Sequence, residues 1–351
     1  MIDIIIPVYN TPIKDLERCF FSFEKQTYEH WQAIIVDDGS KTEIAEYLDY
    51  WQSNHTRFKI IHSENKGVSH ARNLGLDNSD SEYFCFCDSD DTFTENFLQS
   101  ALDLLQAKNL DVVIGGVKTI DENGKILELL HSEEDFIVFD KGNMPLFIDY
   151  ALVGKNRKEN VCLGNSLVAR PYSKIYCANL RNQIRYNEKI SMHEDNLYSF
   201  DIFLNCQRVG VSSEIWYDYY QNCYSLTHAR YNPKRIPEEI FFAEAIYKRL
   251  CLFPDDKPVK IRLALIFIQI LALLTYEKNV AEKIKEILST ECFAVITWKQ
   301  INEISKLYIG LSKKQKLYIK ILGLKFDKIK TFMLVSLIWI HKILRPIKRK
   351  K

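Results

Sequence analysis

Short apolar runs separated by polar turns and helical segments organise the first hundred residues of the chain. Residues 2–8, 31–36, 58–62 and 83–87 are apolar runs of the length of a buried strand. The first three are each followed by a polar turn and a stretch with helical character. Strands that alternate with helices predict right-handed crossovers and a mostly parallel sheet.

The turns after these runs carry helix start signals. Thr11 is placed as an N-cap, with Pro12 at the first helical position. Ser40 to Glu43 has the spacing of a capping box that opens the next helix. Since all the turns follow parallel strands, we expect their polar residues at one edge of the sheet, where open α/β sheets bind ligands.

The remaining chain is interpreted more coarsely. Two further strands are expected at 110–115 and 214–220, a hairpin at 117–120 with 126–130, and a helix over 194–204. A series of helices is expected over 238–306. No internal repeat or low-complexity linker is visible.

Three aspartates, Asp88, Asp90 and Asp91, stand directly after the run that ends at Cys87. Carboxylates this close repel one another unless a cation lies between them. A divalent metal that carries phosphates would explain the group. The alternatives are a solvated acidic turn and, for Asp91 alone, a cap on the following helix.

Five motifs in fixed order resemble family-2 glycosyltransferases of the GT-A fold. They are Ile4 to Asn10, Val36 to Ser40, Asn65 to Asn73, Asp88 to Asp91 and His193 to Asp195. The resemblance covers about residues 1–225. It implies an α/β fold, with a GT-A nucleotide-binding, doubly wound, mostly parallel sheet followed by a C-terminal helical region.

The resemblance also assigns the nucleotide site. Pro7 and Tyr9 belong to its first motif, and Asp38 is expected to accept the imide hydrogen of uracil. Arg72 is expected to face the nucleotide, where a guanidinium forks onto phosphate or base. The plainer interpretations are an N-terminal helix cap for Asp38 and a surface position for Arg72.

The acidic residues divide into donor and catalytic groups. By resemblance, Asp88 contacts ribose or a metal-bound water, and Asp90 coordinates Mg²⁺ or Mn²⁺. Asp195 is the implied general base, supported by Glu194; without the resemblance, this pair would be read as partners of a helix dipole. Lys174 is expected to steady phosphate or acceptor, although lone lysines are mostly solvated.

Length and charge define further regions. The chain has 351 residues, 47% of them hydrophobic. We expect a GT-A domain over 1–225, with a nucleotide-binding half (1–115) and an acceptor half (116–225), then a helical extension over 226–310. The last region, 311–351, holds 13 Lys and Arg against one acid, Asp327; its charge of +12 leaves −11 on the preceding residues.

The basic region predicts a membrane surface as a partner, because an acidic body repels nucleic acid while a basic, apolar tail suits anionic lipid. Its uncharged stretch, 331–341, is shorter than the about 20 residues of a membrane span. An interfacial helix is therefore expected, with a helix docked on the body as the alternative. No signal peptide is recognised, and nine cysteines without C-x-x-C pairs predict neither disulfides nor a zinc site. The expected location is the cytoplasm, peripheral to the inner face of the cell membrane.

The expected function is inverting transfer of a sugar from a nucleotide-sugar, a UDP-hexose or UDP-N-acetylhexosamine, to a lipid-linked glycan in surface polysaccharide synthesis. A sugar nucleotidyltransferase would need a glycine- and arginine-rich phosphate loop where Pro7 to Asn10 stands. A Rossmann oxidoreductase would need G-x-G-x-x-G after the first strand. A non-catalytic scaffold that retains the fold is the remaining alternative, against which Arg72, Asp90 and Asp195 argue.

Overall fold

The computed structural model describes residues 1–145, 147, 165–221, 235–249, 263, 266, 267, 270, 273, 274 and 279–294. These residues belong to two compact units, the first containing the described residues up to 221 and the second those from 235 onward. The domain boundary expected at 225 and the basic region 311–351 lie outside the described residues.

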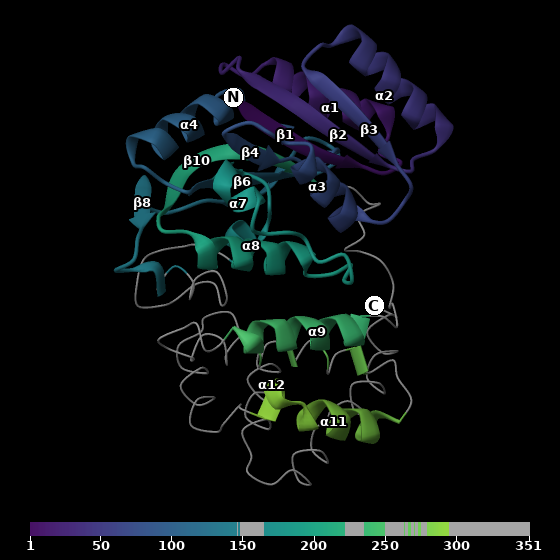
Figure 1. Cartoon of the computed structure of the whole chain (residues 1–351), viewed down its shortest axis with the longest axis vertical. Coiled ribbons are helices and arrows are strands. Elements are labelled where there is room, and N and C mark those ends of the chain that lie inside the picture. Colours follow the sequence, from purple (N-terminus) through teal and green to yellow (C-terminus); the bar gives the residue numbers. More distant parts are fainter. Residues whose placement is uncertain are drawn as a thin grey trace. The chain divides into compact units, whose positions relative to one another are not determined.

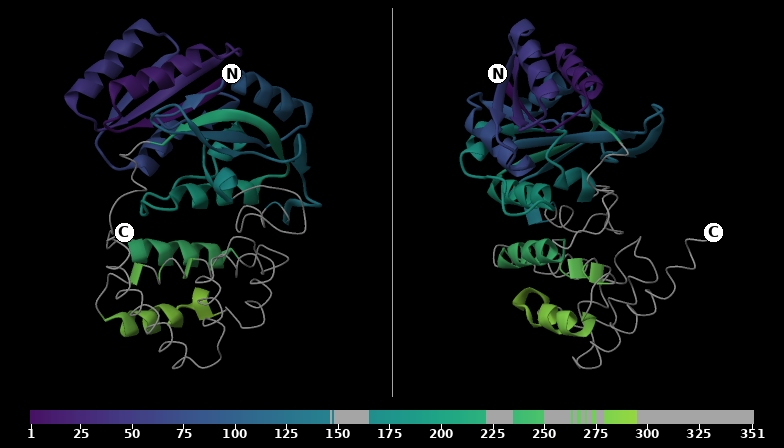
Figure 2. Two further views of the ribbon diagram at one scale, coloured as in Figure 1. Left: turned by 180° about the vertical axis from the view of Figure 1, so that it is seen from behind. Right: turned by 90° about the vertical axis from the view of Figure 1, so that its right-hand side faces the viewer.

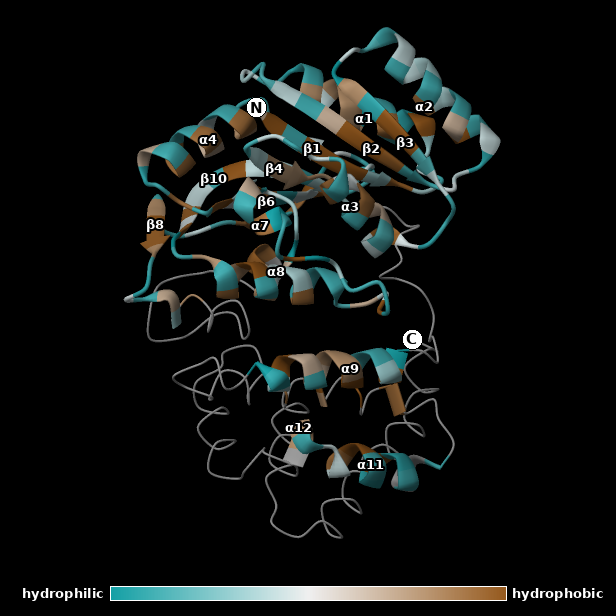
Figure 3. Cartoon of the chain, in the orientation of Figure 1, coloured by the Kyte–Doolittle hydropathy of each residue, from teal (hydrophilic) through white to brown (hydrophobic). Residues whose placement is uncertain are grey.

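Four parallel strands form the first half of the sheet in the order β3-β2-β1-β4 (Figure 1). Their bounds are β1 Ile2–Val8, β2 Trp31–Asp38, β3 Phe58–Ser63 and β4 Tyr83–Phe86. The central strands are almost wholly buried, and Figure 3 shows apolar residues along them. The predicted alternation of strands and helices is therefore confirmed.

Helices cover both faces of this half. Phe20 of α1 packs on Trp51 of α2 with ring centroids 5.3 Å apart, which places both helices on one face. On the other face, Ala71 of α3 packs against Ile34 and Val36. Figures 1 and 2 show α3 on the opposite side of the strands from α1 and α2. The helices are α1 Ile13–Glu24, α2 Thr42–Asn54 and α3 Val68–Asp77.

Antiparallel strands extend the sheet beyond β4. β9 (Lys174–Cys177) lies antiparallel between β4 and β6 (Val112–Ile120), and β10 (Val209–Tyr220) runs parallel to β6. β5 (Thr92–Phe93) and β8 (Phe136–Phe139) pair with β10. β7 (Ile126–Leu130) pairs with β6, as the predicted hairpin requires. The mostly parallel α/β fold is thus confirmed, with β10 starting five residues before its expected position.

The remaining described helices of the first unit flank this second half. They are α4 Phe97–Ala107, α6 Asn165–Ala169, α7 Ala178–Arg181 and α8 Glu194–Asn205. The helix expected over 194–204 is therefore confirmed within one residue.

Two helix start predictions are wrong. Helices α1 and α2 begin at Ile13 and Thr42, and neither has a side-chain cap hydrogen bond. The Thr11 hydroxyl instead lies 2.6 Å from the Ser89 hydroxyl, and Ser40 Oγ accepts a hydrogen bond from the Asn10 amide. In both cases the hydroxyl forms its hydrogen bond with a residue of a neighbouring loop and not with the first turn of the helix.

The second unit contains the helices α9 Arg235–Lys248, α11 Val280–Ser289 and α12 Glu291–Ala294. The Tyr247 hydroxyl of α9 donates to Glu291 at 3.2 Å, and the rings of Phe267 and Phe293 lie 5.1 Å apart. These described helices agree with the helical series expected from the sequence. Among the described residues, no helix has both the length and the apolar character needed to cross a membrane.

Candidate functional site

The loops that leave β1, β2 and β4 are hydrogen-bonded to one another at the carboxyl edge of the sheet. The Asn10 amide donates to Ser40 Oγ, and the Lys41 amide donates to Asn10 Oδ1, both at 2.9 Å. The contact between Thr11 and Ser89 adds the loop after β4. The predicted gathering of polar residues at one edge is therefore observed.

Asp38 connects this edge to the start of α3. Its two carboxylate oxygens accept hydrogen bonds from the amides of Lys66 and Gly67, each at 2.8 Å, and the residue is 3% exposed. Each oxygen keeps a lone pair that a uracil imide can use. Gly39 allows the close approach: its φ is +72°, and a β-carbon there would lie 2.7 Å from the Asn65 nitrogen.

Pro7 and Tyr9 lie on the same edge. Pro7 is half-buried within β1, whereas the Tyr9 side chain, just beyond the strand, is 56% exposed. An exposed aromatic ring at this position is available to stack on a base.

The acidic turn after β4 is held in place by β10. The Asp88 amide donates to the Tyr217 hydroxyl at 3.1 Å, and that hydroxyl donates to Asp91 Oδ2 at 2.7 Å. Asp91 also accepts from the Tyr220 amide at 2.8 Å and is fully buried. Burial, with the charge of Asp90 next in importance, raises the pKa of Asp91 well above its usual value. Asp91 is thus a structural anchor and does not cap α4, which follows Asn96.

Arg72 joins the acidic turn to the start of α8. Its Nη2 donates to Asp88 Oδ1 at 3.0 Å, and its Nη1 donates to Asp195 Oδ1 at 2.6 Å. Glu194 Oε1 lies 3.8 Å from the same Nη1. The three acids belong to segments more than one hundred residues apart in the sequence. One guanidinium, 4% exposed, therefore assembles the predicted donor and catalytic residues.

The environment of α8 changes the ionisation of its two acids. Burial raises the pKa of Asp195, while the Arg72 charge opposes that rise. The pKa of Glu194 is raised to about 8, first by burial and then by the charge of Asp195. The Arg72 charge thus favours the ionised form of Asp195, whereas the raised pKa of Glu194 favours its protonated form at neutral pH.

Lys174 bonds backbone carbonyls and not this group of acids, although its charge acts on Asp195. It is fully buried, and its ammonium donates to the carbonyls of Leu167 (2.9 Å), Arg170 and Tyr172 (3.3 Å). Burial, followed by the Arg170 charge, lowers its pKa to about 7. These three bonds use all the protons of an ammonium. Lys174 therefore shapes the loop before β9, and a phosphate contact would require it to leave these carbonyls.

The carboxylates of the acidic turn differ in their burial and in their partners. Asp91 is buried and hydrogen-bonded and Asp88 is paired with Arg72, whereas Asp90 is half-buried and its carbonyl accepts from Arg18 at 2.6 Å. No group of three or more His, Cys, Asp or Glu residues in the described part of the chain is arranged to hold a metal. One carboxylate with substrate phosphates suffices for Mg²⁺. The residues therefore fit a metal held jointly by Asp90 and a bound diphosphate.

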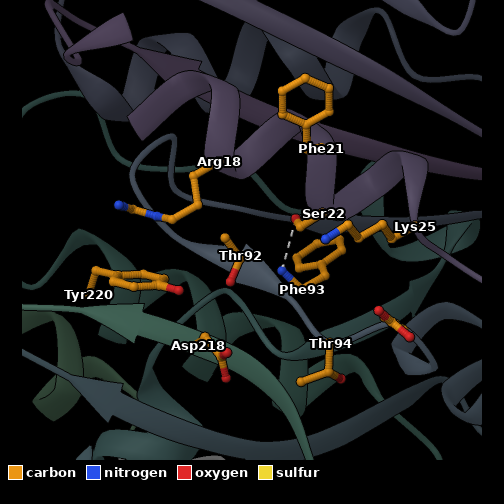
Figure 4. Close-up of a pocket in the computed structure, with 10 residues that line it drawn as sticks. Arg18, Phe21, Ser22, Lys25, Thr92, Phe93, Thr94, Asp218 and Tyr220 are labelled. Carbon is orange, nitrogen blue, oxygen red and sulfur yellow. Dashed lines mark hydrogen bonds between the residues drawn. The ribbon is translucent and has the colours of Figure 1, made fainter. Parts of the chain in front are cut away.

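A separate hollow of about 660 Å³ lies between α1 and strands β5 and β10. Figure 4 shows Arg18, Lys25, Thr92 and Tyr220 around it. None of the predicted site residues lines this hollow. Two of its lining residues bond the acidic turn: Arg18 donates to the Asp90 carbonyl, and the Tyr220 amide donates to Asp91.

The sequence reasoning missed Tyr217 and Arg170. Tyr217 contacts Asp88 and Asp91 from 129 and 126 residues away, so no local pattern marks it. Arg170 stands four residues before Lys174 and is the half-buried cation of the loop that Lys174 shapes. Its only sequence signal was proximity to the motif around Lys174.

The family model described as "Glycosyl transferase family 2" matches residues 3–180. "Glycosyltransferase GlyG" of Streptococcus pneumoniae serotype 4 is 35% identical over 139 residues, which are 39% of this chain and 46% of that protein. "Uncharacterized glycosyltransferase EpsJ" of Bacillus subtilis is 25% identical over 237 residues, 66% of this chain and 64% of that protein. The chain thus spans less than half of the length of GlyG.

Solved structures of S. aureus TarS (residues 1–349) share the fold. The complex with UDP-GlcNAc has a TM-score of 0.61 and 18% identity, and the complex with UDP has a TM-score of 0.60 and 16% identity. Both alignments cover 92% of this chain and 90% of the TarS chain.

Proposed function

Because the chain belongs to glycosyl transferase family 2, we propose that it transfers a hexosyl or N-acetylhexosaminyl group from a UDP-sugar to a hydroxyl of a lipid-linked glycan, with inversion. One observation carries this proposal: Arg72 bonds both Asp88 of the acidic turn and Asp195 of α8. Donor and catalytic residues that are remote in sequence therefore meet at one guanidinium.

Asp195 acts as the general base in this proposal. A carboxylate with a raised pKa is a better proton acceptor than an ordinary aspartate, and a paired cation favours its ionised form. Arg72 provides that cation and fixes the direction of the carboxylate. Glu194, protonated at neutral pH, is available to donate a hydrogen bond to the acceptor.

A single displacement follows from this arrangement. Asp195 removes the proton of the acceptor hydroxyl as that oxygen attacks the anomeric carbon, and UDP leaves from the opposite face. An α-linked donor then gives a β-linked product, with no covalent enzyme intermediate.

A divalent metal, Mg²⁺ or Mn²⁺, belongs with Asp90 in the proposal. When bound, it neutralises charge on the departing diphosphate. Asp90 holds the metal and Asp88 orients the ribose. The hydrogen bond from Arg18 to the Asp90 carbonyl keeps the turn in position before any ligand binds.

The donor class rests on the site and on the fold neighbours. Asp38 offers carboxylate lone pairs to an imide, and Tyr9 offers an exposed ring beside it. The TarS structures that share the fold are complexes with UDP and UDP-GlcNAc. A UDP-sugar is the donor that agrees with both.

The acceptor and location are proposed from the charge of the chain. The basic region 311–351 suits the anionic inner face of the cell membrane, where lipid-linked glycans for surface polysaccharides are available. We place the protein peripherally on that surface, with its chemistry on the cytoplasmic side.

Thermal stabilisation by UDP-, GDP- and dTDP-sugars, with and without Mn²⁺, tests the donor class. A ligand that binds only the folded state raises the melting temperature, so UDP-sugars should raise it and the others should not. The anomeric configuration of the product, determined by NMR, tests inversion. A retained α-linkage would overturn the single displacement.

Asp90→Asn tests the metal. The variant should lose Mn²⁺-dependent UDP binding and transfer while keeping its melting temperature, because the residue lies on a half-buried turn. Asp121→Asn, on the β6–β7 hairpin, is the matched control. Undiminished transfer by wild type in excess chelator would contradict the metal proposal.

A further inference from the structure

The loop between α6 and β9 is rigidly built and presents Arg170. The buried ammonium of Lys174 donates to the carbonyls of Leu167, Arg170 and Tyr172, which fixes the backbone on both sides of Arg170. Three carbonyls grouped around one buried nitrogen hold such a loop before any ligand arrives. The position of the Arg170 side chain is therefore set in advance.

Two tyrosine rings orient the Arg170 guanidinium. Its central carbon lies 5.0 Å from the centroid of Tyr219 and 5.6 Å from that of Tyr172, and Nη1 donates to the Tyr172 hydroxyl at 2.7 Å. The Tyr172 ring stacks on Tyr217 with centroids 4.1 Å apart and planes at 6°. Tyr217 bonds the acidic turn directly. Arg170 is thus separated from that turn by a short stack of rings.

Arg170 also acts electrostatically on both sides of the site. The charge of Asp91 helps to raise the pKa of Arg170, and the Arg170 charge helps to lower that of Asp195. The guanidinium therefore lies within range of the acidic turn and of the proposed base. In the proposed function, the donor diphosphate lies beside this acidic turn.

Arg72 and Arg170 differ in their ion-pair partners. Arg72 pairs with Asp88 and Asp195, whereas no carboxylate in the described part of the chain lies within 4 Å of the Arg170 nitrogens. A half-buried cation ordinarily has an anionic partner. Among the described residues only Nη1 of Arg170 donates a hydrogen bond, which leaves Nε and Nη2 for two parallel hydrogen bonds to one anion.

We propose that Arg170 binds a phosphate group beside the acidic turn, the role that the sequence suggested for Lys174. This inference rests on the proposed function, because that function supplies the anion. The phosphate comes either from the donor diphosphate or from the diphosphate of a lipid-linked acceptor. A fork of two N–H groups suits either source.

Arg170→Met tests the proposal, because methionine keeps an apolar stem against Tyr219 and removes the charge. Calorimetry would measure binding of UDP and of uridine, and then of farnesyl diphosphate to the UDP-saturated protein. Arg57→Met is the matched control: Arg57 also stacks on an aromatic ring, Trp31 at 3.9 Å, but it precedes β3, at the opposite edge of the sheet. Arg170→Lys retains the charge without the fork.

If Arg170 binds a phosphate of the donor, Arg170→Met should weaken UDP binding about 10- to 100-fold and leave uridine binding unchanged. Arg170→Lys should have an intermediate effect on UDP binding. If Arg170 instead binds a phosphate of the acceptor, UDP binding by Arg170→Met should be unchanged and farnesyl diphosphate binding should weaken. If both ligands bind Arg170→Met as they bind wild type, Arg170 only packs on the tyrosines and the inference is wrong. Should Arg170→Met not fold, Arg170→Lys decides by the same comparison. A wild-type protein that binds no uridine nucleotide would overturn the proposed function as well.

Discussion

Arg72 makes the ionisation of each nearby acid depend on the others. It is almost fully buried and bonds Asp88 and Asp195 at once, with Glu194 within ion-pair distance. Burial of a guanidinium is costly, yet its carboxylate partners keep the pKa of Arg72 well above its usual value. The charge state of Asp195 is therefore set mainly by a balance of burial and this one cation.

Asp195→Asn separates binding from chemistry. The amide keeps the size of the side chain but cannot accept a proton, so turnover should fall by about 10²–10⁴. UDP binding, measured by calorimetry, should be retained because Asp195 is assigned to the acceptor side. Asp77→Asn, an exposed acid paired with Arg185, is the control. Near-normal turnover would move the base to Glu194.

Glu194→Gln addresses the acid whose pKa is raised to about 8. A carboxyl whose pKa is raised in the folded state stabilises the fold at pH values below its pKa in the unfolded chain. This contribution is lost as the pH rises through the folded-state pKa of about 8. The melting temperature of wild type should therefore fall between pH 6 and 9 more than that of Glu194→Gln, which mimics the protonated form. The variant should also lose any alkaline decline in turnover near pH 8. Identical pH profiles of both quantities would show that Glu194 is already ionised at neutral pH.

Strand β10 determines the shape of the acidic turn. Its Tyr217 hydroxyl and Tyr220 amide together supply hydrogen bonds to the buried carboxyl of Asp91, and Tyr217 also accepts from the Asp88 amide. The turn is therefore fixed from the second half of the sheet, although its residues follow a strand of the first half. The two halves share one site because of this pairing.

Tyr217→Phe should disturb the turn without removing a site residue. The ring can keep its stack on Tyr172, but Asp91 and the Asp88 amide lose a buried partner, which should cost about 1–3 kcal/mol of unfolding free energy. We also expect weaker Mn²⁺-dependent UDP binding. Denaturant titration and calorimetry measure the two effects.

Tyr198→Phe is the control for that experiment. Tyr198 is equally buried and stacks on Tyr186, but its hydroxyl has no hydrogen-bond partner among the described residues. Its removal should change neither quantity. If the two substitutions had equal effects, the changes in stability and in UDP binding would come from the loss of any buried hydroxyl and not from a change in the shape of the turn.

The whole chain combines an acidic body with a basic end. Its net charge of +1 conceals +12 on residues 311–351 and −11 on the residues before them. Separated charge of this kind directs one end of a protein to an anionic surface and repels the other. Membrane attachment and chemistry should therefore be separable.

Removal of residues 331–351 tests this separation. The full chain should sediment with anionic vesicles at low salt, because each Lys or Arg near such a surface contributes about 1 kcal/mol, and salt should release it. The truncated protein should sediment less and transfer more slowly to a lipid-linked acceptor, with UDP-sugar hydrolysis unchanged. Equal sedimentation of the two proteins would exclude a role of this segment in membrane binding.

The sequence by itself did not predict the short strands β5, β8 and β9, but it determined the parallel half of the sheet and the edge that carries the polar residues. Each of these depends on neighbours in the chain: apolar runs such as Ile2–Val8 bury themselves as strands, and crossover handedness then places every exit loop on one side. The ordered motifs were also sufficient to indicate the family.

Only the tertiary structure decided which partners the polar side chains take. Thr11 and Ser40 form hydrogen bonds with neighbouring loops and do not cap helices, and Lys174 donates to three backbone carbonyls. The bonds of Arg72 to Asp195 and of Tyr217 to Asp91 span 123 and 126 residues. A hydrogen bond depends on distance in space, and local sequence patterns carry no information about contacts between segments so far apart.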